Sequence, residues 1–416
     1  MKTKNYTIIA FVFTLFLTSM SLFSQTFAPK PSGTSYILYD VTIPPAQNLI
    51  AYAAGSQYTT GNAGVIIKST DAGETWQTIY PGTGTTTLGF KKIKFVSDTR
   101  GFAVGQGNTF LKTTDGGTTW TNITVQTDIY YYSCLEFYDA NNGFLIAVTN
   151  SSQVIAYRTT DSGDTWTPIT STTNLQTQAV TYATANVMYS TGGDQKISKS
   201  TDAGNTWTTI KTGINTYYYF GINFKDANNG LVSGEDGEVL MTTNGGTTWT
   251  QILSTGYENL YSLIYRGSKI YAGGTDQNIY YSSNDGGSFT PVNTSSTSSS
   301  TLYGIAVFAN GEALLCGSQG SIVKSTDFLS TSNVSVNENS INHFYNTETK
   351  TLSINSIQEI NINQVELYSI EGKVISTFKT IGNNIELDLN TIQNGVYFVK
   401  LNSVEGSNSS FKFIRN

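Results

Sequence analysis

The chain has 416 residues, carries a formal net charge of −6, and contains 12% charged and 12% aromatic residues. So few charges with so many aromatic residues argue against a disordered chain and against a coiled coil. The acidic balance argues against a nucleic-acid-binding protein, because neutralising phosphates requires a basic face.

The N-terminus has the pattern of a secretory signal peptide. Lys2 and Lys4 precede an apolar run at residues 8–23, which is followed by Ser24. This order predicts a leader over residues 1–24 that is cleaved near Ser24. A membrane anchor is the alternative, but the run has only 16 residues and is interrupted by Thr and Ser. Spanning a bilayer takes about 20 apolar residues, so we expect a protein that is exported and not membrane-spanning.

An eight-residue motif, Ser/Thr-Thr-Asp-x-Gly-x-Thr-Trp, recurs with variations along the next 300 or so residues. Its copies are 40 to 46 residues apart, which is the length of four short strands with turns, or one propeller blade. Seven copies predict an all-β fold, a seven-bladed β-propeller over residues 25–332. The Asp or Asn positions are Asp71, Asp115, Asp161, Asp202, Asn244, Asn284 and Asp327, and the aromatic positions are Trp76, Trp120, Trp166, Trp207, Trp249 and Phe289.

The sequence between copies agrees with this interpretation. In the second blade, residues 91–96, 102–104, 109–112 and 120–123 are predicted strands. The seventh blade lacks a fourth strand led by Trp, and an open edge strand would invite aggregation. Either the mature N-terminus (residues 25–31) or residues 331–336 could cover this edge, and we favour the N-terminus.

The repeated motif resembles the Asp box, or bacterial neuraminidase repeat. It is also similar to the repeats of photosystem II stability and assembly factor propellers and of the sortilin ectodomain, which are binding scaffolds. We expect each Asp to accept backbone N–H bonds within the turn between third and fourth strands. Gly73 and its equivalents would adopt left-handed backbone angles, and the Trp residues would wedge between blades. A calcium site in the turn is the alternative, but it needs several more oxygen ligands, so no metal is predicted.

Residues 333–416 are predicted to form a separate small β-sandwich. Hairpin turns are expected at residues 370–373 and 393–395. The candidate strands are residues 351–354, 365–368, 373–378, 385–389, 396–401 and 411–414.

This C-terminal region resembles the type A sorting domain of the Bacteroidetes type IX secretion system. The resemblance rests on residues 365–373, 387–389, 394–400 and 412–415. The family's Tyr-Pro-Asn-Pro opening is replaced by Phe-Tyr-Asn-Thr at residues 344–347. The resemblance implies that the secretion machinery is a partner. It also implies a route through the periplasm and outer membrane to a secreted or surface-attached location.

Few residues are suited to catalysis. His343 is the single histidine and lies beyond the propeller, which argues against a Ser–His–Asp or Cys–His site and against a histidine metal site. Cys134 and Cys316 fall on blades that are not neighbours, so we expect buried free thiols. A sialidase would need three clamping arginines, but Arg100 and Arg266 fall on the Asp-box face, opposite the expected funnel. No cofactor and no catalytic residue is therefore predicted.

Tyrosines and acids are the candidate ligand-binding residues. They cluster in the loops around the expected funnel, where a Tyr ring offers apolar area with a polar tip. Packing of Tyr between blades and solvation of acidic turns are the alternatives. The candidates are Tyr130, Tyr132, Tyr217, Tyr219, Tyr257, Tyr303, Asp194, Glu235 and Asp236.

We therefore expect an exported, non-enzymatic scaffold that binds a protein, peptide or glycan. A glycoside hydrolase using a pair of funnel carboxylates is the first alternative. A surface or adhesion protein with the propeller as spacer is the second.

Overall fold

The computed structural model divides the chain into two compact units. One comprises residues up to Thr326 without Asn310–Glu312, and the other comprises those three residues with Asp327–Asn416. The predicted leader, the seventh motif at Asp327 and the expected domain boundary after residue 332 lie outside the described residues. The structure describes residues 26–45, 47–57, 63–81, 89–292, 294, 299–309, 311–325, 341–346, 349–356, 362–369, 373–382, 384–403 and 408–415.

Within its described residues, the first unit contains seven four-stranded antiparallel sheets. Blades 1 to 3 are β2 (Ile37–Thr42), β3 (Ala51–Ser56), β4 (Gly64–Ser69) and β5 (Gln77–Pro81); β6 (Phe90–Phe95), β7 (Gly101–Gly105), β8 (Phe110–Thr113) and β9 (Thr121–Asn122); and β10 (Ile129–Phe137), β11 (Gly143–Thr149), β12 (Val154–Thr159) and β13 (Thr167–Ile169). Blades 4 and 5 are β14 (Ala179–Tyr182), β15 (Met188–Thr191), β16 (Ile197–Ser200) and β17 (Thr208–Lys211); and β18 (Tyr219–Phe224), β19 (Gly230–Gly234), β20 (Val239–Thr242) and β21 (Thr250–Leu253). Blades 6 and 7 are β22 (Leu260–Arg266), β23 (Lys269–Gly274), β24 (Ile279–Ser282) and β25 (Thr290–Val292); and β26 (Leu302–Val307), β27 (Ala313–Gly317), β28 (Ile322–Ser325) and β1 (Phe27–Pro29).

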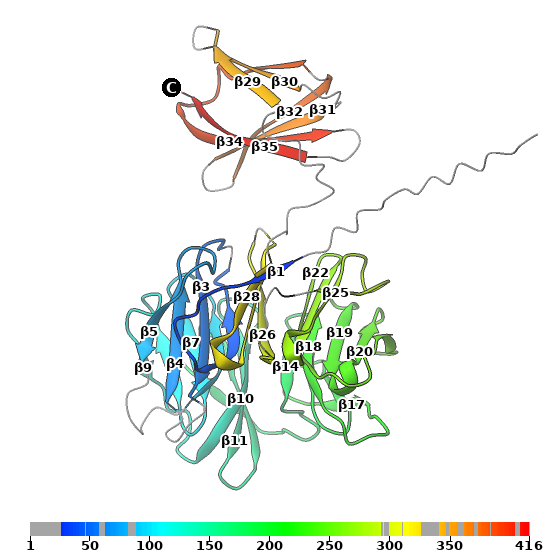
Figure 1. Cartoon of the computed structure of the whole chain (residues 1–416). Helices are drawn as coiled ribbons and strands as arrows, with labels where there is room; N and C mark the ends of the chain where they lie inside the picture. The colour runs from blue at the N-terminus through cyan, green and yellow to red at the C-terminus, as the bar shows by residue number, and fades with distance from the viewer. Residues whose placement is uncertain are drawn as a thin grey trace, which may run out of the picture. The chain divides into compact units, whose positions relative to one another are not determined.

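The innermost strands contact one another in the order β2, β6, β10, β14, β18, β22 and β26, and β26 contacts β2 again. The sheets therefore surround a common axis as a closed ring (Figure 1). This confirms the predicted all-β propeller of seven blades.

Apolar side chains between adjacent blades hold the ring together. The second strand β7 is buried along its whole length because both of its faces pack against neighbouring sheets. Phe102 on β7 stacks on Phe137 of blade 3 at 5.3 Å, and Trp166 of that blade's Asp box lies edge-on to both rings. Paired aromatic rings of this kind stabilise by about 0.5–1.5 kcal/mol beyond the area that they bury.

The N-terminal strand completes blade 7. Strand β1 pairs antiparallel with β28, with Phe27 opposite Ser325 and Pro29 opposite Val323. Phe27 is 1% exposed and its ring lies edge-on to Tyr271 at 6.1 Å. This confirms the N-terminal segment, rather than residues 331–336, as the element that covers the edge of β28.

Each described Asp box is closed by its own hydrogen bonds. Asp115 Oδ1 accepts the Thr119 backbone N–H at 2.9 Å, and its Oδ2 accepts the Thr119 hydroxyl at 2.6 Å. Hydrogen bonds from Thr119, and from Thr113, lower the pKa of Asp115 to about 2. Asn244 keeps the backbone bond, accepting the N–H of Thr248 at 2.9 Å. The Asp side chain is thus engaged within its turn, and the described residues include no group of three His, Cys, Asp or Glu side chains suited to a metal.

The second unit is a two-sheet sandwich. One sheet has the order β29–β30–β33 and the other β32–β31–β34–β35. The strands are β29 (Ile341–Asn346), β30 (Thr351–Ser356), β31 (Ile362–Ser369), β32 (Val374–Gly382), β33 (Asn384–Asp388), β34 (Gly395–Ser403) and β35 (Asn408–Arg415). Both sheets contribute to one apolar core that includes Leu352, Ile385, Val365, Val399 and Phe413.

All six predicted strands of this unit are present, together with β29, which was not predicted. The expected hairpin at residues 393–395 is wrong. Strand β33 pairs with β30 and β34 pairs with β31, so this turn joins the two sheets instead. No helix among the described residues of either unit is long and apolar enough to cross a membrane.

Candidate functional site

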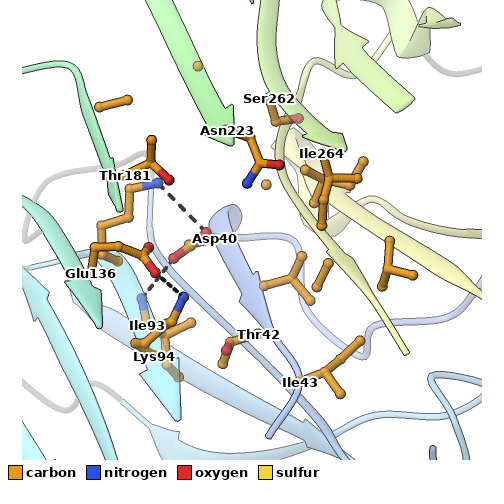
Figure 2. Close-up of a pocket in the computed structure, with 18 of the residues that line it drawn as sticks. Asp40, Thr42, Ile43, Ile93, Lys94, Glu136, Thr181, Asn223, Ser262 and Ile264 are labelled. Carbon is orange, nitrogen blue, oxygen red and sulfur yellow. Dashed lines mark hydrogen bonds and ion pairs between the residues drawn. The ribbon is translucent and has the colours of Figure 1, made fainter. Parts of the chain in front are cut away.

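A cavity of about 580 Å³ lies at the centre of the propeller ring. All seven innermost strands contribute to its lining (Figure 2). The lining also includes residues that follow first strands, such as Pro44, Tyr138 and Ala309. In an antiparallel blade, the turn after strand one is on the same face as the Asp-box turn after strand three. The cavity therefore reaches the Asp-box face, whereas the sequence placed the funnel on the opposite one.

β-Bulges select which side chains face the axis. In six innermost strands the pairing with the second strand skips one residue at the same point, and a bulge of this kind re-aims a side chain. Strand β14 has no such shift. The residues skipped at this point are Tyr39, Lys91, Ser133, Phe220, Tyr261 and Tyr303, and β10 has a second bulge at Tyr130.

Four of these bulged residues form a continuous aromatic arc across blades 5, 6, 7 and 1. The ring centroids of Phe220 and Tyr261 are 4.7 Å apart, those of Tyr261 and Tyr303 are 5.2 Å apart, and those of Tyr303 and Tyr39 are 5.4 Å apart. Phe220, Tyr261 and Tyr303 line the cavity. Because they come early in their strands, the aromatic arc lies at the end of the cavity away from the Asp-box face.

The opposite wall is charged and comes from blades 1 to 3. Asp40 Oδ1 lies 3.7 Å from Lys92 Nζ, and Glu136 Oε1 lies 2.5 Å from Lys94 Nζ. Asp40 Oδ2 also accepts the backbone N–H of Ile93 at 3.0 Å, which joins blade 1 to blade 2. We refer to Asp40, Lys92, Lys94 and Glu136 as the charged wall. Its two acids and two bases balance.

Burial and pairing shift the pKa values within the charged wall. Burial raises the pKa of Asp40, although the Lys92 ammonium opposes this. The Asp40 carboxylate in turn raises the pKa of Lys92 despite its partial burial. Asp40 therefore ionises less readily than a surface aspartate, while Lys92 holds its proton.

Uncharged polar groups from blades 4 to 6 complete the lining. Asn223 Oδ1 accepts the Tyr265 backbone N–H at 2.9 Å, and Figure 2 shows Asn223 Nδ2 directed toward the Asp40 side. Ser262 is 7% exposed, and its Oγ has no hydrogen-bond partner among the described residues. Thr181 lies beside the charged wall (Figure 2). We refer to Thr181, Asn223 and Ser262 as the polar wall.

The close approach of blade 7 to blade 1 requires a glycine at position 304. A Cβ at Gly304 would lie 2.8 Å from the Asp40 Cα and 2.9 Å from Cys316 Sγ. Backbone atoms cannot move away as a side-chain tip can, so the missing side chain allows β2 to hold Asp40 in place.

The structure separates the candidate tyrosines into three groups. Tyr303 lines the cavity. Tyr130, near the start of β10, and Tyr257, in the loop before β22, lie at the far face and are 61% and 82% exposed, and Tyr217 on that face is half-buried.

Tyr132 and Tyr219 are buried between blades and are not among the residues that line the central cavity. They are 0% and 1% exposed and pack in the cores between blades. The Tyr132 hydroxyl donates to Asn108 Oδ1 at 3.0 Å. The bulges at Tyr130 and Ser133 shift the alternation of β10, so that Tyr132 points into the sheet packing.

The candidate acids lie outside the cavity lining. Asp194 has a φ of +54° in the turn after β15, and it pairs with Lys196 at 2.9 Å. Glu235 and Asp236 form the short 3₁₀ turn η1 (Glu235–Gly237) after β19. The structure therefore does not bring these three acids to the residues of the central cavity.

Sequence reasoning missed the charged wall, Asn223, Ser262, Phe220 and Tyr39. One signal was present for the charged wall. Lys92 and Lys94 fall inside the predicted first strand at residues 91–96, and the only polar surroundings of such a strand in a propeller are the channel.

The cysteine prediction is confirmed. Cys134 on β10 and Cys316 on β27 are buried free thiols. The three propeller arginines are on blades 2, 3 and 6, and Arg100 donates to the Ser162 carbonyl at 2.9 Å and to Asp164 Oδ1 at 3.1 Å. Arg100 is thus used between blades rather than in a carboxylate clamp.

Family models match two parts of the chain. Residues 64–196 match the family described as sortilin, neurotensin receptor 3, and residues 344–416 match the secretion system C-terminal sorting domain. The first match agrees with the sortilin-like propeller. The second confirms the sorting domain and indicates a secreted or cell-surface protein. None of the curated proteins matches the chain.

Solved structures share the fold at low identity. YCF48 bound to D1 peptide has a TM-score of 0.58 and 16% identity, covering 74% of this chain and 99% of that one. YCF48 from Cyanidioschyzon merolae has a TM-score of 0.54 and 17% identity, covering 72% and 98%. PorZ, a surface component of the type-IX secretion system of Porphyromonas gingivalis, has a TM-score of 0.57 and 12% identity, covering 92% of this chain. The chain spans 60% of the length of PorZ.

Proposed function

We propose that the protein is an exported, non-enzymatic propeller scaffold that binds a protein, peptide or glycan in its central cavity. The observation that carries the proposal is the state of the charged wall. Both of its carboxylates are paired with lysines, Asp40 with Lys92 and Glu136 with Lys94. Ion-paired side chains in a preformed cavity of about 580 Å³ are suited to orienting a ligand.

Export is assigned to the C-terminal unit. The match of residues 344–416 to sorting domains supports the secretion machinery as its partner. The propeller would then act outside the cell. A propeller of the same fold is described as bound to a peptide, which supports ligand binding by this architecture.

A glycoside hydrolase is the second candidate, and one observation favours it. Burial raises the pKa of Asp40, as expected of a general acid. Two features weigh against this role. Asp40 Oδ2 is occupied by the Ile93 amide, and Lys92 lies 3.7 Å from Oδ1. Glu258, in the loop before β22, is buried, is not among the residues lining the cavity, and accepts hydrogen bonds from Asn278 and Tyr280.

The test is an assay of the purified full chain with a panel of plant and host oligosaccharides. We expect no release of reducing sugar over background. The matched variant is Asp40→Asn, which keeps an oxygen for the Ile93 amide but cannot supply a proton. If the wild-type chain releases reducing sugar and the Asp40→Asn variant does not, the protein is a glycoside hydrolase and the scaffold proposal is wrong.

A further inference from the structure

We propose that the central cavity binds a carbohydrate, with a sugar ring on the aromatic arc and its hydroxyls between the charged and polar walls. This inference names the ligand class of the proposed binding site and therefore rests on the proposed function. It is carried by the distribution of side chains around the cavity.

The first step is the aromatic arc. Phe220, Tyr261 and Tyr303 lie side by side over three consecutive blades, with centroid separations of 4.7 and 5.2 Å. Their faces carry the negative part of the ring quadrupole. The C–H face of a sugar ring is apolar and slightly positive at its hydrogens, so it is complementary to such a surface.

The second step is the balance of charge. A ligand with one net charge, such as a peptide terminus, would be matched by an unpaired side chain of opposite sign. At the charged wall Asp40 and Glu136 each face a lysine, and the one other charged residue of the lining, Arg266, is the last residue of β22, at the end of the cavity away from the aromatic arc. Sugar hydroxyls both donate and accept hydrogen bonds, so they can bridge a carboxylate and an ammonium group together.

The third step is the polar wall. Ser262 Oγ is buried and without a partner among the described residues, although buried hydroxyls are normally hydrogen-bonded. Asn223 uses its Oδ1 within the ring, while Figure 2 shows its Nδ2 directed toward Asp40. Both groups suit the hydroxyls of a polyhydroxylated ligand.

The fourth step concerns the strand edges that an extended peptide would use. A peptide adding to a sheet needs free backbone groups at its edge. On β6 the Ile93 N–H is bonded to Asp40, and on β22 the Tyr265 N–H is bonded to Asn223. Asp40 and Asn223 thus occupy backbone N–H groups on two of the strand edges that face the axis. The charged and polar walls therefore favour recognition of a compact ligand by side chains.

The experiment is saturation-transfer NMR on the full chain with the methyl glycosides of glucose, galactose, mannose and N-acetylglucosamine. At least one glycoside is expected to show transfer to its ring C–H protons. Tyr261→Leu, in the aromatic arc, should weaken that binding about tenfold, which is the loss of one ring contact. The matched control is Tyr257→Leu, because Tyr257 is 82% exposed and outside the cavity lining, and this variant should bind as the wild type does.

Unfolding midpoints of both variants show whether lost binding reflects lost structure. If Tyr261→Leu unfolds early, Ser262→Ala provides the second cavity variant. Equal binding by wild type and the cavity variants would overturn the inference. If random-sequence peptides bind and none of the glycosides binds, the inference is overturned too, while the proposed scaffold function stands. Release of reducing sugar would instead overturn the proposed function.

Discussion

Phe27 lies opposite Ser325 in the ladder between β1 and β28, so the first described strand of the chain completes its last blade. The same junction contains an ion-pair network. Glu74, in the Asp box of blade 1, lies 2.6 Å from Lys30 and 2.9 Å from Lys324. Ring closure therefore joins the N-terminal segment, blade 1 and blade 7.

Substituting Phe27 with Ala should open this junction. The ring is 1% exposed, and truncating a buried Phe costs about 3–5 kcal/mol. The matched control is Lys30→Ala, which removes a partly exposed ion pair worth about 1 kcal/mol or less. Urea unfolding measures both variants. Equal losses would contradict a closing role for Phe27.

Acid should destabilise the propeller through its Asp boxes. The pKa of Asp115 and of Asp161 is about 2 instead of 3.8, because hydrogen bonds from Thr119 and Thr165 favour the carboxylates. A carboxyl whose pKa is lower in the folded state stabilises fully above its unfolded pKa. That stability is lost as the pH falls from about 4 toward 2.

The variant Asp161→Asn tests this source of acid sensitivity. Asn already occupies the equivalent position at Asn244, where it accepts the same backbone bond. The variant should thus fold at neutral pH and lose less stability than the wild type between pH 4 and 2. Urea unfolding at several pH values gives the slope of the unfolding free energy against pH. If this slope is the same in the variant and the wild type, other groups cause the acid sensitivity.

Asp40→Ala should destabilise the propeller by about 2 kcal/mol. The substitution leaves the buried Ile93 N–H without an acceptor, which costs about 1–3 kcal/mol. It also leaves Lys92 without its partner. Asp40→Asn restores an oxygen for the amide and should recover part of the loss. Calorimetric unfolding compares the two, and a fully stable Asp40→Ala chain would contradict this account.

Neither cysteine should react in the folded protein. Burial raises the pKa of Cys134 to about 11 and raises that of Cys316 as well, so little thiolate forms at pH 8. Iodoacetamide should modify no thiol in native conditions and both in denaturant, as counted by intact mass. Rapid native modification of one thiol would place it at an accessible position.

The carbohydrate inference and the hydrolase alternative make opposite demands on the charged wall. Binding uses Asp40 and Glu136 as paired, ionised groups, whereas hydrolysis needs a proton on one carboxylate. Asp40→Asn therefore changes affinity in the first case and turnover in the second.

The sequence by itself determined the architecture of this protein. A blade is a local unit, and its turn is closed by residues four positions apart, as Asp115 and Thr119 show. The spacing of the motif therefore sufficed to predict seven blades and their strand order. The C-terminal strands were likewise read from local alternation.

Only the tertiary structure decided which side chains meet at the axis. A bulge shifts the alternation of a strand by one residue, and this shift separates exposed Tyr130 from buried Tyr132. Asp40, Lys92 and Ser262 come from blades 1, 2 and 6 and line one cavity because β26 closes the ring onto β2. Local patterns do not encode bulge positions or contacts between distant blades, so the candidate site emerged from the closed ring.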